Sequence, residues 1–149
     1  LAPSEMCIRD SLMSEDPSVS HPAAIAWNTW ELSISQLLPN TNIAQKLGEP
    51  AWLLAHSRIE IHYFTNRGFM EDGQLLKKEN IDRIRHIPTT IVQGRYDVVC
   101  PPISAWELHK AWPESQLHFV HDAGHSATEP GTKKKLIEAC DAYATSVEI

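Results

Sequence analysis

Gly94-Arg95-Tyr96-Asp97 and Gly124-His125-Ser126 each follow a short run of residues that is typical of a β-strand. The first run spans 89–93, the second spans 116–120, and a helix that begins with two prolines is predicted between them, over 101–112. Strands that alternate with helices of this length predict an α/β fold with parallel pairing. Because neighbouring parallel strands end at the same edge of a sheet, we expect the acidic side chain and the imidazole to lie close together.

The residues before this α/β segment, 12 to about 86, predict helices instead. Helices are expected over about 16–38, 50–66 and 75–84, and a last one over about 129–145. The first begins at Asp16-Pro17-Ser18, where an acidic residue precedes an early proline, and it ends before Pro39-Asn40-Thr41-Asn42. Apolar side chains at helical spacing support the first two helices. They are Ala23, Ala24, Ala26, Trp27, Trp30 and Ile34 in the first helix, and Trp52, Ala55, Ile59 and Tyr63 in the second.

Composition narrows the class of protein. A chain of 149 residues suits one ordinary domain, with little room for two independent ones. Its net charge of −6 argues against nucleic acid or an anionic membrane as the main partner. The three cysteines form no Cys-x-x-Cys and leave an odd number, which favours a reducing compartment. No apolar stretch approaches the ~20 residues that span a bilayer, so we expect a cytoplasmic protein.

Residues 1–11 stand apart from this pattern. They show neither an apolar period nor a helix-capping residue, and residues 3–11 resemble translated adapter sequence from short-read assemblies. We set residues 1–11 aside as a doubtful leader, for which a sequencing artefact is one explanation. The chain begins with a leucine, and we expect it to be a fragment of a longer protein.

The two motifs at the strand ends suit nucleophilic catalysis. A serine hydroxyl is a poor nucleophile at neutral pH and needs a base within hydrogen-bonding reach, a role that suits histidine. A carboxylate that accepts the second ring N–H fixes the tautomer and stabilises the imidazolium. Asp97 and His125 are our candidates for this acid and this base, and their order is that of the last two members of an α/β-hydrolase triad.

Each of these residues also has a simpler interpretation. Asp97 alone could cap a turn, and His125 alone could be a loop histidine bonded to backbone; their combination after two strands favours catalysis. The side chains of His118, His121 and Asp122 raise the alternative of a zinc site with the same histidine. However, His118 lies in a predicted strand, where side chains alternate between faces, so it need not converge with the others. We expect no metal and no cofactor.

Five motifs in order resemble the carboxyl-terminal part of the proline iminopeptidase (prolyl aminopeptidase) family, serine peptidases of the α/β-hydrolase superfamily. These stretches are Ala26-Trp27-Asn28-Thr29-Trp30-Glu31, Arg58-Ile59-Glu60-Ile61-His62-Tyr63-Phe64, Gly94-Arg95-Tyr96-Asp97 with Cys100-Pro101, Ala105-Trp106-Glu107-Leu108-His109-Lys110-Ala111-Trp112-Pro113, and Asp122-Ala123-Gly124-His125-Ser126 with Glu129-Pro130-Gly131. The resemblance covers residues 12 to 146. It implies that residues 12–86 are a segment of a helical cap domain and that residues 87–149 are the last part of the catalytic core.

By the same resemblance Asp97 and His125 are the triad acid and base, and Glu31 and Glu60 match cap glutamates that receive the free α-amino group of the substrate. An enzyme that removes only an amino-terminal proline must recognise a cationic secondary amine, which carboxylates can hold by charge-assisted hydrogen bonds. Without the resemblance, both glutamates are more typical of solvated helix positions. The implied partner is a peptide with an amino-terminal proline, and the oligomeric state stays open.

The sequence departs from the family at the nucleophile. It contains no Gly-x-Ser-x-Gly motif and no His-Gly-Gly loop that would supply oxyanion donors. Ser126 is a poor substitute, because a triad needs its serine and its histidine on separate loops. We therefore expect the chain alone to be inactive. Two other functions stay open: a different α/β-hydrolase, such as an esterase or an epoxide hydrolase, and a truncated, non-catalytic module that binds a partner through exposed apolar surface.

Overall fold

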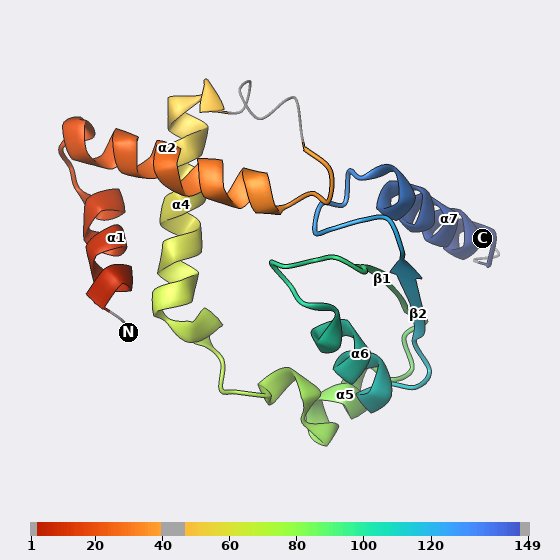
Figure 1. The fold of residues 1–149 in the computed structure, drawn as a ribbon. Helices are drawn as coiled ribbons and strands as arrows, with labels where there is room; N and C mark the ends of the chain where they lie inside the picture. Colours follow the sequence, from red (N-terminus) through yellow and green to blue (C-terminus); the bar gives the residue numbers. More distant parts are fainter. Residues whose placement is uncertain (1–2, 40–46, 147–149) are drawn as a thin grey trace. The chain divides into compact units, whose positions relative to one another are not determined.

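The computed structural model describes residues 3–39 and 47–146 (Figure 1). In chain order the elements are α1 (Pro3–Met13), α2 (Pro17–Ile34), α4 (Pro50–Thr65), the 3-10 helices η1 (Arg67–Phe69) and η2 (Gln74–Leu76), α5 (Lys78–Ile84), β1 (Thr90–Gly94), α6 (Pro102–Ala111), β2 (Gln116–Val120) and α7 (Pro130–Ser146). They form two compact units. The helical unit contains α1, α2 up to residue 33, α4 and η1; the α/β unit contains residues 34–39 and the chain from residue 73 onward. Within the described ranges, no helix combines the length and apolar character that a membrane span requires.

A helix at the start of the chain belongs to the helical unit. Leu12 of α1 is fully buried and shares a small apolar core with residues of α2 and α4. The guanidinium of Arg58 in α4 donates hydrogen bonds to the backbone carbonyls of Leu12 at 2.9 Å and Ser14 at 3.0 Å, and so holds the carboxyl end of α1. The sequence pattern predicts no helix over residues 1–11. The helix α1 is stabilised by this contact with a distant helix, which a local pattern does not reveal.

The second helix begins where the sequence predicts but buries an unexpected residue. Asp16 precedes Pro17 and accepts the backbone N–H of Ser18 at 2.8 Å, and the hydrogen bonds from Ser18 hold the pKa of Asp16 below its usual value. An apolar stripe normally faces the core, yet Trp30 is 63% exposed whereas Asn28 is fully buried. The Asn28 amide donates to two backbone carbonyls, one in each helix, and so links α2 to α4.

The helix α4 spans the predicted range to within one residue but turns a different face inward. Leu53, Ser57 and Ile61, spaced one turn apart, are buried. Ile59 and Tyr63 of the apolar stripe are more than half exposed. Ser57 is accommodated in the interior because its hydroxyl donates to the carbonyl of Leu53 at 2.7 Å. Burial in this helix is therefore decided by the neighbouring helices and not by its own apolar stripe.

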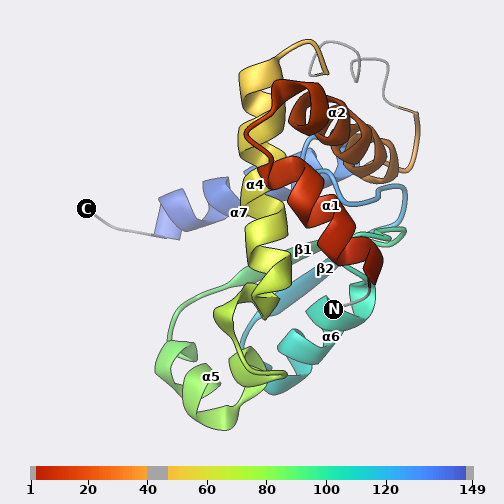
Figure 2. The same ribbon diagram turned by 90° about the vertical axis from the view of Figure 1, so that its left-hand side faces the viewer.

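The α/β unit confirms the predicted parallel pairing. β1 and β2 pair in parallel, from Thr90 opposite Gln116 to Gly94 opposite Val120. α6 connects the two strands, and α6 and α7 lie on opposite faces of the sheet, as Figures 1 and 2 show. The strand bounds agree with the predicted runs to within one residue. The structure thus has the α/β organisation that brings the two loops of interest to one edge.

The segment after α2 belongs to the α/β unit, and it explains why α2 ends at Ile34 and not near residue 38. The backbone carbonyl of Ser35 accepts the N–H groups of His125 at 3.0 Å and Ser126 at 2.7 Å. Backbone groups that bond to another loop are not available to continue a helix. The predicted break at residues 39–42 lies largely outside the described residues.

Two glycines allow the loops after β1 and β2 to meet. A Cβ atom built on Gly94 would lie 1.8 Å from the carbonyl oxygen of Gly124 and 2.9 Å from that of Ala123. Both obstacles are backbone atoms, which cannot rotate away as a side chain can. The contact therefore requires the absence of a side chain at position 94.

We expect Arg58→Met to destabilise the helical unit by about 1–2 kcal/mol, because it removes two charge-assisted hydrogen bonds from partly exposed carbonyls. Urea denaturation followed by circular dichroism measures the change. The matched control is Arg83→Met on the exposed surface of α5. Equal stability of the two variants would contradict the docking of α1 on α4.

We expect Gly94→Ala to destabilise the α/β unit by about 3 kcal/mol or more, because the added methyl group displaces backbone. The control is Gly73→Ala. Gly73 has a φ of 71°, but a Cβ there meets nothing within 4 Å, so only the backbone penalty of about 1–2 kcal/mol applies. Comparable losses in denaturant midpoint for the two variants would show that the loops are not in contact.

Candidate active site

The acidic candidate lies in the loop that follows β1. Asp97 is buried, with 6% of its side chain exposed. Its Oδ1 accepts the backbone N–H groups of Val99 at 3.0 Å and Cys100 at 2.8 Å. Its Oδ2 accepts the side-chain amide of Gln93 at 3.2 Å. These donors fix the orientation of the carboxylate and compensate for the water that it has lost.

The imidazole candidate lies in the loop that follows β2. Nδ1 of His125 is 3.0 Å from Oδ2 of Asp97, and 38% of the histidine side chain is exposed. A carboxylate can only accept, so this contact requires a proton on Nδ1, and in the neutral imidazole the lone pair is then on Nε2. The structure thus brings together the two side chains that the sequence singles out. The imidazole is the more exposed of the two partners.

Backbone hydrogen bonds join the two loops beyond the ends of the strands. The N–H of Arg95 donates to the carbonyl of Val120 at 2.9 Å. The N–H of Tyr96 donates to the carbonyl of Ala123 at 3.0 Å. The separation of the carboxylate and the imidazole is therefore set by main-chain contacts as well as by the side chains themselves.

A second buried carboxylate supports the histidine loop. Glu129, 7% exposed, immediately precedes α7 and accepts the backbone N–H of Gly124, with N–O distances of 2.9 and 3.1 Å to its two oxygens. The same carboxylate lies 3.4 Å from the backbone nitrogen of Leu37. The sequence pattern does not predict this contact. An acidic residue directly before a proline at a helix start is the signal that could have found it.

The helical unit holds Glu60 beside aromatic rings. The indole N–H of Trp27 donates to Glu60 Oε2 at 2.6 Å, and His56 Nδ1 lies 3.3 Å from the same oxygen without hydrogen-bond geometry. The His56 ring stacks on Trp52, with centroids 4.7 Å apart, and the Trp27 ring lies 6.1 Å from that of Phe64. One quarter of the Glu60 side chain is exposed. Such a carboxylate can accept further donors from a cationic group.

Glu31 is the other glutamate that the sequence singles out. It lies on α2 one turn after Trp27, the residue that bonds to Glu60, and it is partly buried. Residues one turn apart share a helix face, so Glu31 is on the same side of α2 as the indole. The structure thus places both glutamates in the helical unit and links Glu60 to the helix that carries Glu31.

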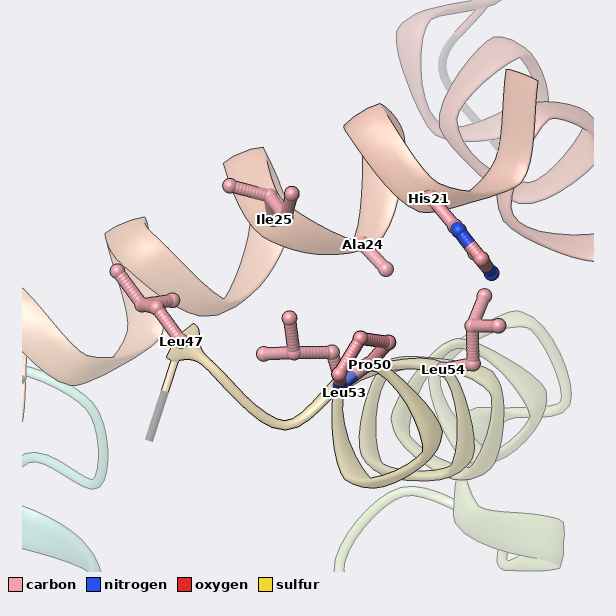
Figure 3. Close-up of a pocket in the computed structure, with 7 residues that line it drawn as sticks. All are labelled: His21, Ala24, Ile25, Leu47, Pro50, Leu53 and Leu54. Carbon is pink, nitrogen blue, oxygen red and sulfur yellow. The ribbon is translucent and has the colours of Figure 1, made fainter. Parts of the chain in front are cut away.

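A pocket between α2 and α4 is a different place in the same unit (Figure 3). It is lined by His21, Ala24, Ile25, Leu47, Pro50, Leu53 and Leu54. None of these side chains is a carboxylate. An ammonium group needs several hydrogen-bond acceptors, and apart from the His21 ring the lining side chains are apolar. The pocket therefore does not suit the amine of a peptide.

Cys100 lies close to Asp97, but its chemistry does not suit a nucleophile. Burial raises the pKa of the Cys100 thiol above its usual value, and the negative charge of Asp97 adds to the effect. The thiolate is the reactive form of cysteine. A raised pKa keeps this side chain as the less reactive thiol at neutral pH.

The zinc alternative finds no support in the described part of the chain. Within residues 3–39 and 47–146, no group of three or more His, Cys, Asp or Glu side chains is arranged to hold a metal ion. His125 instead pairs with Asp97.

Comparison with known proteins finds several proline iminopeptidases of similar sequence. No family profile matches the sequence. The chain is 54% identical over 129 residues to a proline iminopeptidase of Arabidopsis thaliana, covering 86% of this chain and 33% of that protein. It is 53% identical over 133 residues to a probable proline iminopeptidase of Leptolyngbya boryana, covering 89% and 41%, respectively. It is 46% identical over 134 residues to a proline iminopeptidase of Xanthomonas citri, covering 89% and 42%.

The chain therefore spans between a third and about two fifths of the length of these curated relatives. The matches extend over most of the chain and include both units. By sequence, this chain is similar over nearly nine tenths of its length to part of several proteins named proline iminopeptidase.

Proposed function

We propose that this chain is the carboxyl-terminal part of a serine aminopeptidase that releases proline from the amino terminus of peptides. The observation that carries the proposal is the 3.0 Å contact between His125 Nδ1 and Asp97 Oδ2, formed by loops at the ends of two parallel strands. The names of the relatives support the reaction class. The nucleophilic serine and the oxyanion donors come from a part of the protein outside this sequence.

In this mechanism His125 moves a proton between the serine and the leaving group. Nε2 takes the proton of the serine hydroxyl as the oxygen attacks the carbonyl carbon of the amino-terminal proline. Asp97 stabilises the resulting imidazolium through Nδ1 and stays ionised. The imidazolium then gives its proton to the leaving amine as the peptide C–N bond breaks. Water, activated by the same imidazole, hydrolyses the acyl-enzyme.

Recognition of the proline amine falls to Glu60 and Glu31. The secondary amine is cationic at neutral pH, and its two N–H groups need acceptors once the substrate is bound. Glu60 supports this role because Trp27 fixes one of its oxygens and only a quarter of its side chain is exposed. Such surroundings strengthen an ion pair with a bound ammonium group.

We propose that residues 12–86 form a segment of the cap and that residues 87–149 form the last part of the catalytic core, with residues 1–11 outside both. Parallel sheets are normally covered on both faces, yet Thr90 to Gln93 of β1 are only half-buried. Large apolar side chains beside the acid loop are also exposed, including Val98 at 68% and Ile103 at 56%. The remainder of the catalytic domain would cover these surfaces.

The proposed partner is a peptide substrate, and we expect neither a nucleic acid nor a membrane as a partner. The net charge of −6 supports this, because polyanionic partners attract basic proteins. We propose a cytoplasmic location, which the unpaired state of Cys7, Cys100 and Cys140 supports.

We expect Glu60→Gln and Glu31→Gln, made in the intact protein, each to lower kcat/KM for proline-β-naphthylamide by about 10- to 100-fold. Each change replaces a charge-assisted hydrogen bond to the substrate amine by a neutral one. The double variant should be crippled. Steady-state kinetics measure the effect, and Glu107→Gln on the exposed surface of α6 is the matched control.

The same variants should hydrolyse 4-nitrophenyl acetate at the wild-type rate, because this ester has no amine. Unchanged cleavage of proline-β-naphthylamide by the double variant would instead favour a different α/β-hydrolase, such as an esterase or an epoxide hydrolase.

We expect the purified 149-residue chain to show no cleavage of proline-β-naphthylamide above background, because it supplies the acid and the base without a nucleophile. The longer gene product, with a Gly-x-Ser-x-Gly serine upstream, should be active, and alanine at that serine should abolish the activity. Hydrolysis by the 149-residue chain that is lost in His125→Ala would show that its nucleophile lies within this sequence. Absence of the upstream motif, with a stable monomer in size-exclusion chromatography, would favour a non-catalytic module.

A further inference from the structure

The buried carboxylate of Glu129 binds two segments that are far apart in the sequence. Its shorter contacts, 2.9 and 3.1 Å, are with the backbone N–H of Gly124, the residue before the histidine. Its longer contacts, 3.4 Å, are with the backbone N–H of Leu37, in the segment that follows α2. The shorter contacts are the stronger hydrogen bonds, so this carboxylate bonds mainly to the histidine loop.

The segment of residues 34–39 binds the same loop from its other end. The carbonyl of Ser35 accepts the N–H groups of His125 and Ser126. All three backbone N–H groups from Gly124 to Ser126 are thus engaged, one by Glu129 and two by Ser35. Because Glu129 also holds Leu37, two residues after Ser35, it supports the histidine loop both at Gly124 and through this segment.

Packing at Gly124 leaves little room for a side chain. A Cβ atom built there would lie 3.0 Å from the nitrogen of Leu37 and 3.2 Å from Oε1 of Glu129. The glycine is therefore enclosed between the carboxylate and the segment after α2. Removing the carboxylate would leave a buried N–H without an acceptor and would open space beside the loop, and both effects favour a shift of the backbone.

We propose that Glu129 is a positioning residue for the general base: it holds the loop 123–126 so that the imidazole of His125 meets Asp97 and the attacking serine in one geometry. The inference rests on the proposed function of His125 as a base. Glu129 acts through the backbone of Gly124 and Leu37 and does not touch the substrate. A base displaced by as little as about 1 Å can cost about 100-fold in rate, so the carboxylate matters to kcat more than to substrate binding.

The test uses Glu129→Ala and Glu129→Gln in the intact protein. We expect kcat for proline-β-naphthylamide to fall about 10- to 100-fold in Glu129→Ala, with KM unchanged within about twofold. Glu129→Gln should be affected less, because its amide oxygen still accepts one N–H and its shape is conserved. The rate of covalent labelling by a fluorophosphonate should fall in parallel, because that reaction needs the same base to deprotonate the serine but no proline pocket.

The matched control is Ser115→Ala. Ser115 is a buried polar residue of the same unit, and its hydroxyl donates to the carbonyl of Trp112 at 2.7 Å, away from the histidine loop. The variant Ser115→Ala should lower the thermal unfolding midpoint without changing kcat or the labelling rate per folded molecule. If the Glu129 variants lose kcat and labelling only in proportion to their folded fraction, as this control does, the role is merely structural and the proposal is wrong.

Other outcomes separate this proposal from the proposed function. A rise in KM at constant kcat would make Glu129 a substrate ligand and overturn the positioning role. A wild-type protein that is labelled but does not cleave proline-β-naphthylamide would end the peptidase proposal, while slower labelling of the Glu129 variants would still support positioning. A wild-type protein that resists labelling altogether would overturn both.

Discussion

A buried carboxylate and a partly exposed imidazole meet at 3.0 Å in the α/β unit, and much of the local structure serves this contact. It depends on the parallel register of β1 and β2, which ends with Gly94 opposite Val120. The loops that follow β1 and β2 therefore begin side by side at one edge of the sheet. The absence of a side chain at Gly94 lets the two loops touch through their backbones, so main-chain contacts help to set the distance between the acid and the imidazole.

The site contains two buried carboxylates, and both are satisfied largely by backbone N–H groups. Asp97 accepts those of Val99 and Cys100, and Glu129 accepts that of Gly124. Burial of a carboxylate is costly unless hydrogen bonds replace its water, and amides held in a loop supply such bonds in a fixed direction. One carboxylate therefore orients the imidazole itself, whereas the other orients the backbone that carries it.

The helical unit uses a carboxylate in a different environment. Glu60 is held by the indole of Trp27 and lies among aromatic rings, with part of its side chain exposed. A carboxylate fixed on one side and accessible on the other suits a cationic ligand. Under the proposed function, the two units would carry complementary chemistry: proton transfer in one and recognition of an amine in the other.

The sequence by itself determined the elements with strong local signals: the acidic residue and proline at the start of α2, the range of α4, the two strands and their parallel pairing, and Asp97 and His125 as a pair. Periodicity and turn residues act over a few neighbours, so these features can be predicted locally. Only the tertiary structure decided that α1 is a helix, that Asn28 is buried, that α2 ends at Ile34, and that Glu129 supports the histidine loop. Each of these depends on hydrogen bonds or burial between segments distant in the chain, which no local pattern encodes.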